Sequence, residues 1–254
     1  MAERLDGTVA LITGTSSGIG AATAMALAGQ GAAVALVARR VERLQQLAEE
    51  ITKGGGKALV IETDVTDKAQ AQAAVERTIK ELGRLDTLVN NAGVMLLGPI
   101  ENAPLEEWDR MVQLNVLGLL YTAHAALPHL LKAAEDSPRH VADLVNISSV
   151  AGRVARSGSG VYNTTKFGVT AFNESLRQEV TKRHVRVSVV EPGAVATELT
   201  NHLRPEIREA QQQRFAGVEQ LESEDIADAI QYIVTRPRRM AINEMLIRPT
   251  EQEA

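Results

Sequence analysis

Tyr162 and Lys166 lie four residues apart in the segment VYNTTK, near the start of an amphipathic stretch. Residues i and i+4 share one face of an α-helix, so the phenol and the ammonium group can meet. They are either an ordinary surface pair or an acid–base pair in which the lysine tunes the tyrosine pKa. Lowering a tyrosine pKa from about 10 to about 7 requires about 4 kcal/mol, whereas a helical pair in water supplies about 0.2–0.5 kcal/mol. The acid–base interpretation therefore requires close approach in a water-poor site.

A glycine-rich turn follows the first apolar run of the chain. The segment TGTSSGIG, residues 13–20, leads into a helix-like stretch that begins AATAMALA. Gly14, Gly18 and Gly20 suit a tight turn and a close approach of the backbone to a phosphate. The helix N-terminus beyond them offers free N–H groups to a pyrophosphate. A glycine turn without a ligand is the alternative, but the strand–turn–helix context favours dinucleotide binding.

The end of the second apolar run indicates which dinucleotide is bound. An acidic residue there favours NAD, and a basic residue favours the 2′-phosphate of NADP. The run ends Val37-Ala38-Arg39-Arg40, without a carboxylate. Arg39 is the candidate phosphate ligand and Arg40 a second one, whereas two solvated arginines are the alternative. We therefore predict NADP(H) as the cofactor.

Apolar runs that alternate with amphipathic stretches predict the elements that must hold these residues. The expected strands are 8–13, 33–38, 58–63, 86–90, 143–148, 186–191 and 244–248, and the expected helices are 18–30, 41–53, 67–82, 104–132, 160–183 and 224–234. This alternation predicts an α/β fold, a single Rossmann-type doubly wound parallel sheet of about seven strands with helices on both faces. We expect one domain over 1–254, a solvent loop at 133–140 and a substrate lid near 194–222.

The composition argues against several other classes of protein. A net charge of −5 without a long basic block gives no support for nucleic acid as a partner. The absence of cysteine removes thiolate catalysis and disulfides and fits a cytoplasmic protein. The apolar run 115–131 is interrupted by polar residues, so we expect a buried or interface helix and no membrane association. Five histidines without an HExxH motif predict no metal site.

Short motifs along essentially the whole chain resemble those of the short-chain dehydrogenase/reductase family. They are Thr13–Gly20 as TGxxxGxG, Asn90-Asn91-Ala92-Gly93, Asn115, Ser149 thirteen residues before the tyrosine, Tyr162 with Lys166, and Pro192-Gly193. The resemblance implies hydride transfer between a nicotinamide and a carbonyl or alcohol carbon. It implies that Tyr162 is the general acid/base and that Ser149 holds the substrate oxygen. It further implies that Lys166 binds the ribose and that Asn115 holds a water leading to Lys166.

The same resemblance implies a set of cofactor contacts. They are Gly14, Ser16, Ser17, Gly18, Ile19, Gly20, Arg39, Arg40, Asp64, Val65, Asn91, Ala92, Gly93, Tyr162, Lys166, Pro192, Gly193, Val195 and Thr197. Asp64 and Val65 would meet the adenine, and Thr197 the nicotinamide amide or the pyrophosphate. Ser17 departs from some NADP-using relatives, which carry a basic residue there.

The substrate and the assembly are also matters of resemblance. The segments VMLLGPIENA and INEMLIRPT resemble a cluster of the family that includes clavulanic acid dehydrogenase and serine or 3-hydroxy acid dehydrogenases. This implies a small aldehyde, ketone or 3-hydroxy acid, with Arg153, Arg156 and His202 as candidate carboxylate ligands or else solvated residues. The alternatives are a 3-oxoacyl-thioester reductase and a non-catalytic NADP-binding sensor or scaffold. Family members pair through helices matching 104–132 and 160–183, which implies a homodimer or homotetramer.

Overall fold

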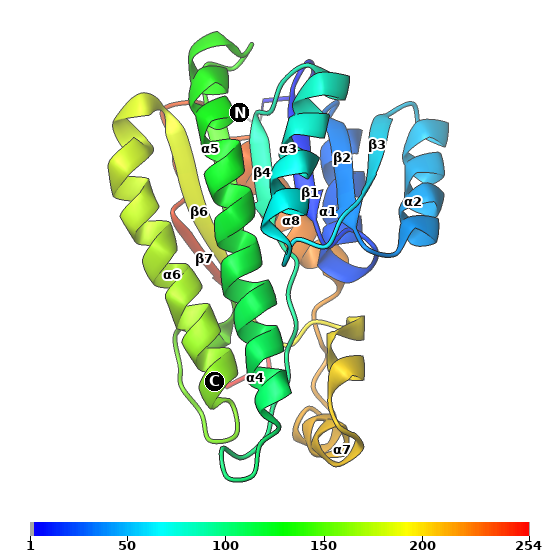
Figure 1. The fold of residues 1–254 in the computed structure, drawn as a ribbon, viewed down its shortest axis with the longest axis vertical. Coiled ribbons are helices and arrows are strands. Elements are labelled where there is room, and N and C mark those ends of the chain that lie inside the picture. The colour runs from blue at the N-terminus through cyan, green and yellow to red at the C-terminus, as the bar shows by residue number, and fades with distance from the viewer. Residues whose placement is uncertain (1–2, 254) are drawn as a thin grey trace.

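A parallel sheet of seven strands forms the centre of residues 3–253, the part of the chain that the computed structural model describes (Figure 1). The strands are β1 (Val9–Thr13), β2 (Ala33–Ala38), β3 (Lys57–Glu62), β4 (Thr87–Asn90), β5 (Ala142–Ile147), β6 (Val185–Pro192) and β7 (Glu244–Ile247). Their order, β3-β2-β1-β4-β5-β6-β7, reverses between β1 and β4. Ligands of such sheets bind beyond the carboxyl ends of the strands at this reversal. The predicted doubly wound α/β sheet is therefore confirmed.

Helices cover both faces of the sheet, because every central strand is apolar on both sides. One layer consists of α1 (Gly18–Gly29), α2 (Val41–Lys53) and α8 (Ser223–Val234), and the other of α3 (Lys68–Leu82), α5 (Leu119–Asp136) and α6 (Gly160–Val180). Side chains alternate across a strand. In β2, Val34 and Leu36 enter the core under the first layer, whereas Ala35 and Val37 enter the core under the second.

The predicted helix over 104–132 differs from the observed one in two ways. The structure divides it into α4 (Leu105–Val112), a π-helical turn η1 (Gln113–Gly118) and α5. The helix also continues to Asp136, so the solvent loop predicted at 133–140 is wrong for its first residues. Ala133 and Ala134 are 2% and 3% exposed, and their burial in the core extends the helix.

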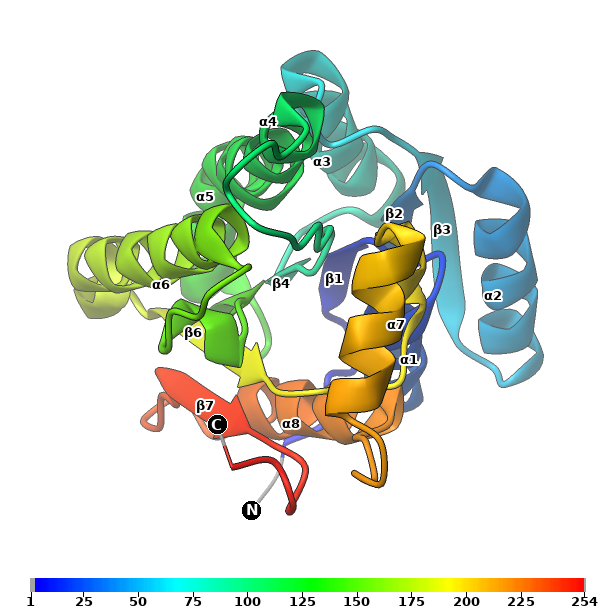
Figure 2. The same cartoon turned by 90° about the horizontal axis from the view of Figure 1, so that it is seen from below.

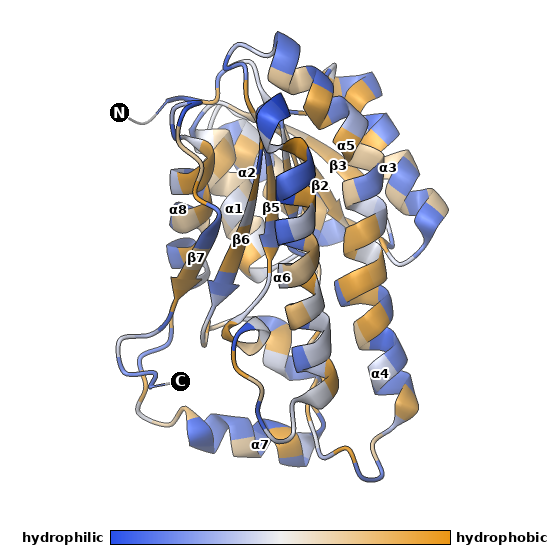
Figure 3. Cartoon of the chain, turned by 90° about the vertical axis from the view of Figure 1, so that its left-hand side faces the viewer, coloured by the Kyte–Doolittle hydropathy of each residue, from blue (hydrophilic) through white to orange (hydrophobic). Residues whose placement is uncertain are grey.

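The continuous helix Leu105–Asp136 is long and apolar enough to cross a membrane by length and composition alone. In the fold it packs beside the sheet, where Leu119, Ala123, Ala126 and Leu130 are buried in the core. Figure 3 shows the hydrophobic colour on α5 and the mainly hydrophilic colour on α7 (Pro205–Arg214). The packing on the sheet accounts for much of the apolar content of this helix.

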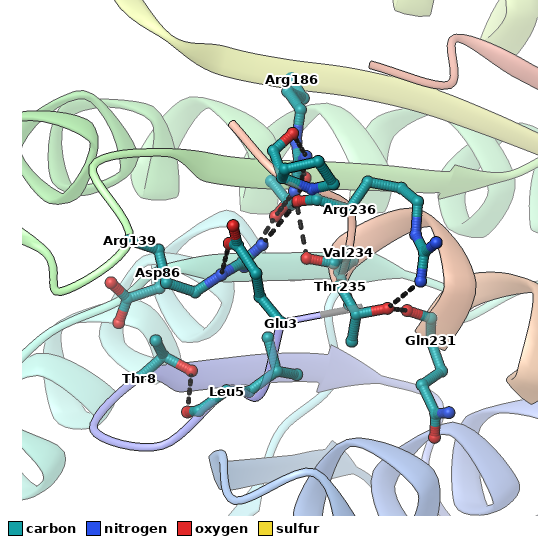
Figure 4. Close-up of polar contacts among 12 residues, drawn as sticks. Glu3, Leu5, Thr8, Asp86, Arg139, Arg186, Gln231, Val234, Thr235 and Arg236 are labelled. Carbon is teal, nitrogen blue, oxygen red and sulfur yellow. Dashed lines mark hydrogen bonds and ion pairs between the residues drawn. The ribbon is translucent and has the colours of Figure 1, made fainter. Parts of the chain in front are cut away.

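A buried ion cluster closes the end of the sheet where β5 and β6 begin (Figure 4). Arg186 donates to both carboxylate oxygens of Asp143 at 2.7 and 2.9 Å. Its guanidinium also donates to the carbonyls of Val234, Arg236 and Met240. These bonds fasten the end of α8 to the sheet at the edge opposite the carboxyl ends of the strands.

The segment predicted as a lid, residues 194–222, contains two helical pieces that the sequence reading did not resolve. They are η4 (Glu198–His202) and α7. Its neck is closed by backbone bonds from Ala196 to Leu221 (2.8 Å) and from Leu221 to Ala194 (3.0 Å). Figure 2, which looks at the ends of the strands, shows α7 in front of β1, β2 and α1, and Figure 1 shows it below the sheet. The segment therefore covers the place where a ligand of this sheet would bind.

Candidate active site

The glycine turn forms a surface that has no room for side chains. Gly14 and Gly18 have φ values of 73° and 57°, which favour glycine. A Cβ on Gly20 would lie 2.5 Å from both the Asn91 amide nitrogen and the Gly14 carbonyl oxygen. Asn91 is held there because its Nδ2 donates to the Thr13 carbonyl at 2.9 Å. The bare backbone and the start of α1 fit the pyrophosphate of a dinucleotide.

A cavity of about 1130 Å³ runs from this turn along the carboxyl ends of the strands. That volume lies just above the range of about 300–1,000 Å³ that is usual for small-ligand sites. Most of the predicted residues line it, namely Gly14, Ser16, Ser17, Gly18, Ile19, Arg39, Arg40, Asp64, Val65, Asn91, Ala92, Gly93, Ser149, Tyr162, Lys166, Pro192, Gly193, Val195 and Thr197. Gly20 and Asn115 are not among the lining residues; Gly20 packs against the turn, and Asn115 lies behind Gly93.

The two predicted arginines differ in what they contact. Arg40 donates to the hydroxyls of Ser16 (2.9 and 3.0 Å) and Ser17 (2.8 Å). The Arg39 side chain is 65% exposed and reaches Asp64 only at 3.8 Å. Arg43, which the sequence reading missed, donates to the Ser16 carbonyl from the first turn of α2. Because Arg40 precedes α2 and Arg43 follows three residues later, helix periodicity was the available signal for the second arginine.

Tyr162 and Lys166 share the inner face of the first turns of α6. Tyr162 is 7% exposed, and the Lys166 Nζ lies 5.8 Å from the centre of its ring. The ammonium group donates to the carbonyl of Ile147 at the end of β5, at 2.9 Å. Ser149 lies beyond the same strand end and caps a short 3₁₀ turn, where its Oγ accepts from the Ala151 N–H. One strand end therefore positions both the serine and the lysine.

Burial moves both pKa values away from their ordinary values. Desolvation raises the pKa of Tyr162 to about 12, against a smaller lowering by its hydrogen bond with Ser149. Desolvation also lowers the pKa of Lys166 to about 8. Each shift disfavours the charged form in a water-poor site. The phenol is therefore protonated at neutral pH, and the lysine is still mainly charged there.

Asn115 lies in the π-helical turn and is 2% exposed. Its Oδ1 accepts from the Val94 N–H and its Nδ2 donates to the Val94 carbonyl, both at 2.8 Å. A Cβ on Gly93 would lie 3.3 Å from the Asn115 Oδ1 and 3.8 Å from the Lys166 Nζ. Asn115 thus fixes the loop after β4, and its amide oxygen and the Lys166 ammonium group both lie beside Gly93. A π-turn in a helix frequently marks a functional position.

Serine 148 is turned away from the acid–base pair. Its hydroxyl donates to the Lys166 carbonyl at 3.1 Å and lies 3.2 Å from the Thr170 hydroxyl. Ser148 and Ser149 both line the cavity, but only the Ser148 hydroxyl is bonded to Lys166 and Thr170 of α6. This is the arrangement expected when Ser149 faces the substrate and Ser148 holds α6 against β5.

Apolar side chains enclose the end of the cavity beside Tyr162. Tyr162 packs in a cluster with Val94, Leu97, Met111 and Leu203, the last of which comes from the lid segment. Leu203 is 3% exposed, so the segment is closed onto the site in this structure. An enclosure of this kind excludes water, which strengthens the electrostatic interactions inside it.

The three basic residues predicted as candidate carboxylate ligands differ in whether they line the cavity. Arg153 is committed to Glu191, to whose carboxylate oxygens its Nε donates at 2.8 Å, and also contacts Glu244. Arg156 and His202 line the cavity. Burial and the neighbouring arginines lower the pKa of His202. Only Arg156 and His202 therefore remain placed to meet a substrate.

The remaining predicted cofactor residues mainly shape the cavity wall. Asp64 accepts from the Thr66 N–H (3.0 Å) and hydroxyl (2.8 Å), which forms the turn that begins at the end of β3. Thr197 caps η4 through the Leu199 N–H at 3.3 Å. Its methyl group would lie 3.2 Å from a Cβ on Gly18, so the base of the lid segment rests on the glycine turn.

A buried chain of amides, also missed from the sequence, lies beneath the site. Thr122 donates to the Asn90 Oδ1 (2.6 Å), Asn90 donates to the Asn146 Oδ1 (3.0 Å), and Asn146 donates to the Asn173 Oδ1 (3.0 Å). The chain joins α5, β4, β5 and α6, the elements whose ends carry Gly93, Ser149 and the Tyr162–Lys166 pair. Its members are all at most 3% exposed.

Comparisons with known proteins agree with this geometry. The profile of the short chain dehydrogenase family matches residues 8–208. An uncharacterized oxidoreductase of Staphylococcus saprophyticus is 36% identical, over 96% of each chain. The glycine betaine reductase ATRR of Emericella nidulans is 40% identical over 98% of this chain. The match covers only 19% of the length of that larger protein. A serine dehydrogenase complexed with NADP+ superposes with a TM-score of 0.88 at 30% identity, over 97% of both chains. The chain therefore belongs to the short-chain dehydrogenase family and is an oxidoreductase of that family.

Proposed function

We propose that this protein is an NADP(H)-dependent oxidoreductase that interconverts a carbonyl and an alcohol on a small substrate, with Tyr162 as the general acid/base. One observation carries the proposal. Tyr162, Lys166 and Ser149 meet at the end of β5, on the wall of a cavity whose other end is a glycine turn suited to a pyrophosphate. The first two residues are buried, so the acid–base pair works in a water-poor site.

The chain's own groups divide the proton chemistry between them. A bound nicotinamide supplies the hydride during reduction or accepts it during oxidation. In reduction the neutral Tyr162 phenol, with its pKa near 12, donates its proton to the substrate oxygen. Ser149 hydrogen-bonds the same oxygen and fixes its position. Lys166 brings a positive charge near the phenol and favours the phenolate that remains after the transfer.

We assign the 2′-phosphate of NADP to the group formed by Ser16, Ser17, Arg40 and Arg43. Arginine guanidinium groups bind phosphate through paired N–H donors. Because Arg40 donates to both serine hydroxyls, each hydroxyl keeps its own hydrogen for a phosphate oxygen. The serine dehydrogenase that superposes on this chain carries NADP+, which supports this preference.

The substrate is proposed to be a small aldehyde, ketone or 3-hydroxy acid. The cavity wall beside Tyr162 is apolar, through Met95, Leu97 and Leu114, and carries Arg156 and His202 as polar groups. This combination suits a short carbon chain with one polar or charged end. A 3-oxoacyl thioester is the competing substrate, and the test below includes it.

Pairing of this chain with further copies is also proposed. Leu105 and Val112 on α4 and Phe167 on α6 are 63%, 39% and 43% exposed. Exposed apolar side chains gathered on neighbouring helices mark association surfaces. A homodimer or homotetramer would cover them, and a mass from light scattering equal to one chain would contradict this assignment.

The test of the proposed function combines cofactor binding with turnover. NADPH and NADH are titrated by fluorescence against the purified protein, which is then assayed with small aldehydes, 3-oxo acids and a 3-oxoacyl thioester. We expect tighter binding of NADPH and a loss of turnover of at least about 100-fold in Tyr162→Phe with cofactor binding unchanged. Tyr232→Phe is the matched control, because Tyr232 is 45% exposed on α8. Binding without turnover of any substrate would favour the non-catalytic sensor instead.

A further inference from the structure

A glutamate from the lid segment occupies the basic group to which we assign the 2′-phosphate. Glu198, the first residue of η4, contacts Arg40 through one carboxylate oxygen at 2.9 Å and Arg43 through the other at 2.6 Å. Each oxygen meets a different guanidinium, so the carboxylate bridges the two arginines. This contact joins residues 155 and 158 positions apart in the sequence.

The position of Glu198 is set by the glycine turn itself. The preceding residue, Thr197, rests against Gly18 and caps the start of η4. The parallel bridge between Val195 and Leu221 closes the neck of the segment just before it. The carboxylate is therefore delivered to the arginines by a short, anchored stretch of chain and not by a free loop. Its charge is secure, because hydrogen bonds from Arg43 and Arg40 lower its pKa to about 2.

The charges of the group favour a phosphate over the carboxylate. Glu198 brings one negative charge to two arginines. Without a ligand, the group of two guanidinium groups and one carboxylate therefore has a net charge of +1. A phosphate monoester carries about −1.5 to −2 at pH 7 and has three acceptor oxygens. It can neutralise both guanidinium groups and also accept from the hydroxyls of Ser16 and Ser17. NADH lacks this phosphate and leaves Glu198 in its place.

We propose that Glu198 is a determinant of cofactor specificity, which competes with the 2′-phosphate of NADP(H) for Arg40 and Arg43. Phosphate binding displaces the carboxylate and frees the start of the lid segment, whereas a cofactor without the phosphate leaves that contact closed. The proposal rests on the proposed function, because it takes the cavity as the cofactor site. It adds a residue outside the glycine turn and the second strand to the control of cofactor choice.

The test measures binding of four ligands to three proteins. NADPH, NADH, adenosine 2′,5′-bisphosphate and AMP are titrated against the wild type, Glu198→Gln and Glu209→Gln. The control removes the same charge from an exposed position on α7 that does not line the cavity. Glu198→Gln removes two exposed ion pairs that the phosphate would otherwise have to break. We therefore expect NADPH and the bisphosphate to bind about three- to ten-fold more tightly to this variant than to the wild type. NADH and AMP should change less than about two-fold, since they do not displace the carboxylate.

A second measurement follows the lid segment without any ligand. The segment carries Arg214, followed by Phe215, where trypsin can cleave if the segment opens. Glu198→Gln should be cleaved there faster than the wild type and Glu209→Gln, and NADPH should speed this cleavage of the wild type more than NADH does. Equal changes for all four ligands, or tightening in the control, would overturn the competition and leave the proposed function intact. No binding of NADPH or the bisphosphate to the wild type would overturn both.

Discussion

Replacing Lys166 by methionine should make the folded protein more stable at neutral pH while it abolishes turnover. Burial lowers the pKa of this lysine from 10.5 to about 8. The difference, at about 1.36 kcal/mol per pH unit, is a cost of about 3 kcal/mol for holding the charged lysine in the folded state. Methionine has a similar length and no charge to bury. It forfeits the hydrogen bond to the Ile147 carbonyl, which is worth about 1 kcal/mol, so a net gain of about 2 kcal/mol is expected.

The sign of the effect is tested by its dependence on pH. Between pH 8 and 10.5 the unfolded chain binds more protons at this lysine than the folded chain does, so the stability of the wild type rises with pH in this window. The cost is about 3 kcal/mol at pH 7 and about 1 kcal/mol at pH 9.5. The advantage of Lys166→Met should therefore shrink by about 2 kcal/mol between these two values.

Urea unfolding of both proteins at the two pH values measures this change. Tyr162 also titrates at high pH, but it is present in both proteins and cancels from the comparison. Lys182→Met, at an exposed position, serves as the control and should show no pH-dependent difference from the wild type. A Lys166→Met protein that is less stable than the wild type by the same amount at both pH values would refute the reasoning.

Two other predictions concern the same end of the sheet. Burial raises the pKa of Tyr162 to about 12, and alcohol oxidation needs the phenolate form. The kcat/KM of alcohol oxidation should therefore rise by up to about tenfold per pH unit between pH 7 and 9, whereas that of carbonyl reduction should not. An oxidation rate that is independent of pH would contradict this prediction. Asn146→Ala strands the Nδ2 of Asn90 and the Oδ1 of Asn173 in the core, at about 1–3 kcal/mol each, so urea unfolding should show a loss of about 2–5 kcal/mol. A loss below about 1 kcal/mol, or an equal loss in the exposed Asn201→Ala, would show that the amide chain is not stabilising.

The strands and the placing of the main site residues were predictable from local patterns. Apolar runs such as 33–38 read as buried strands because both faces of the sheet are covered. The four-residue spacing of Tyr162 and Lys166 places both on one face of α6, and the structure buries both. The turn formed by Gly14, Gly18 and Gly20 could be predicted because a turn without room for a Cβ accepts only glycine.

The rest depended on contacts that local patterns do not contain. Arg39 and Arg40 both line the cavity, and their roles as phosphate ligands stay predictions. That the Arg40 side chain turns toward Ser16 and Ser17 is a contact that spacing alone does not determine. Glu198 meets its arginines across more than 150 residues, so no periodicity reports it. The π-turn at 113–118 and the helical residues 133–136 follow from packing against the sheet, which overrides the loop-like composition of the second segment.

The π-turn adds one residue between two parts of one long helix. The first part packs in the apolar cluster that contains Tyr162, and the second packs on the sheet. Met111 faces the lid cluster and Ala123 faces the sheet core, twelve residues later. At about 100° per residue a regular helix would carry them about 120° out of phase, whereas eleven residues would return within about 20° of three full turns. The helix can therefore be understood as a regular one into which one residue has been inserted between 113 and 118. The insertion presents Asn115 to the loop after β4, and its deletion would leave the packing on the sheet in phase.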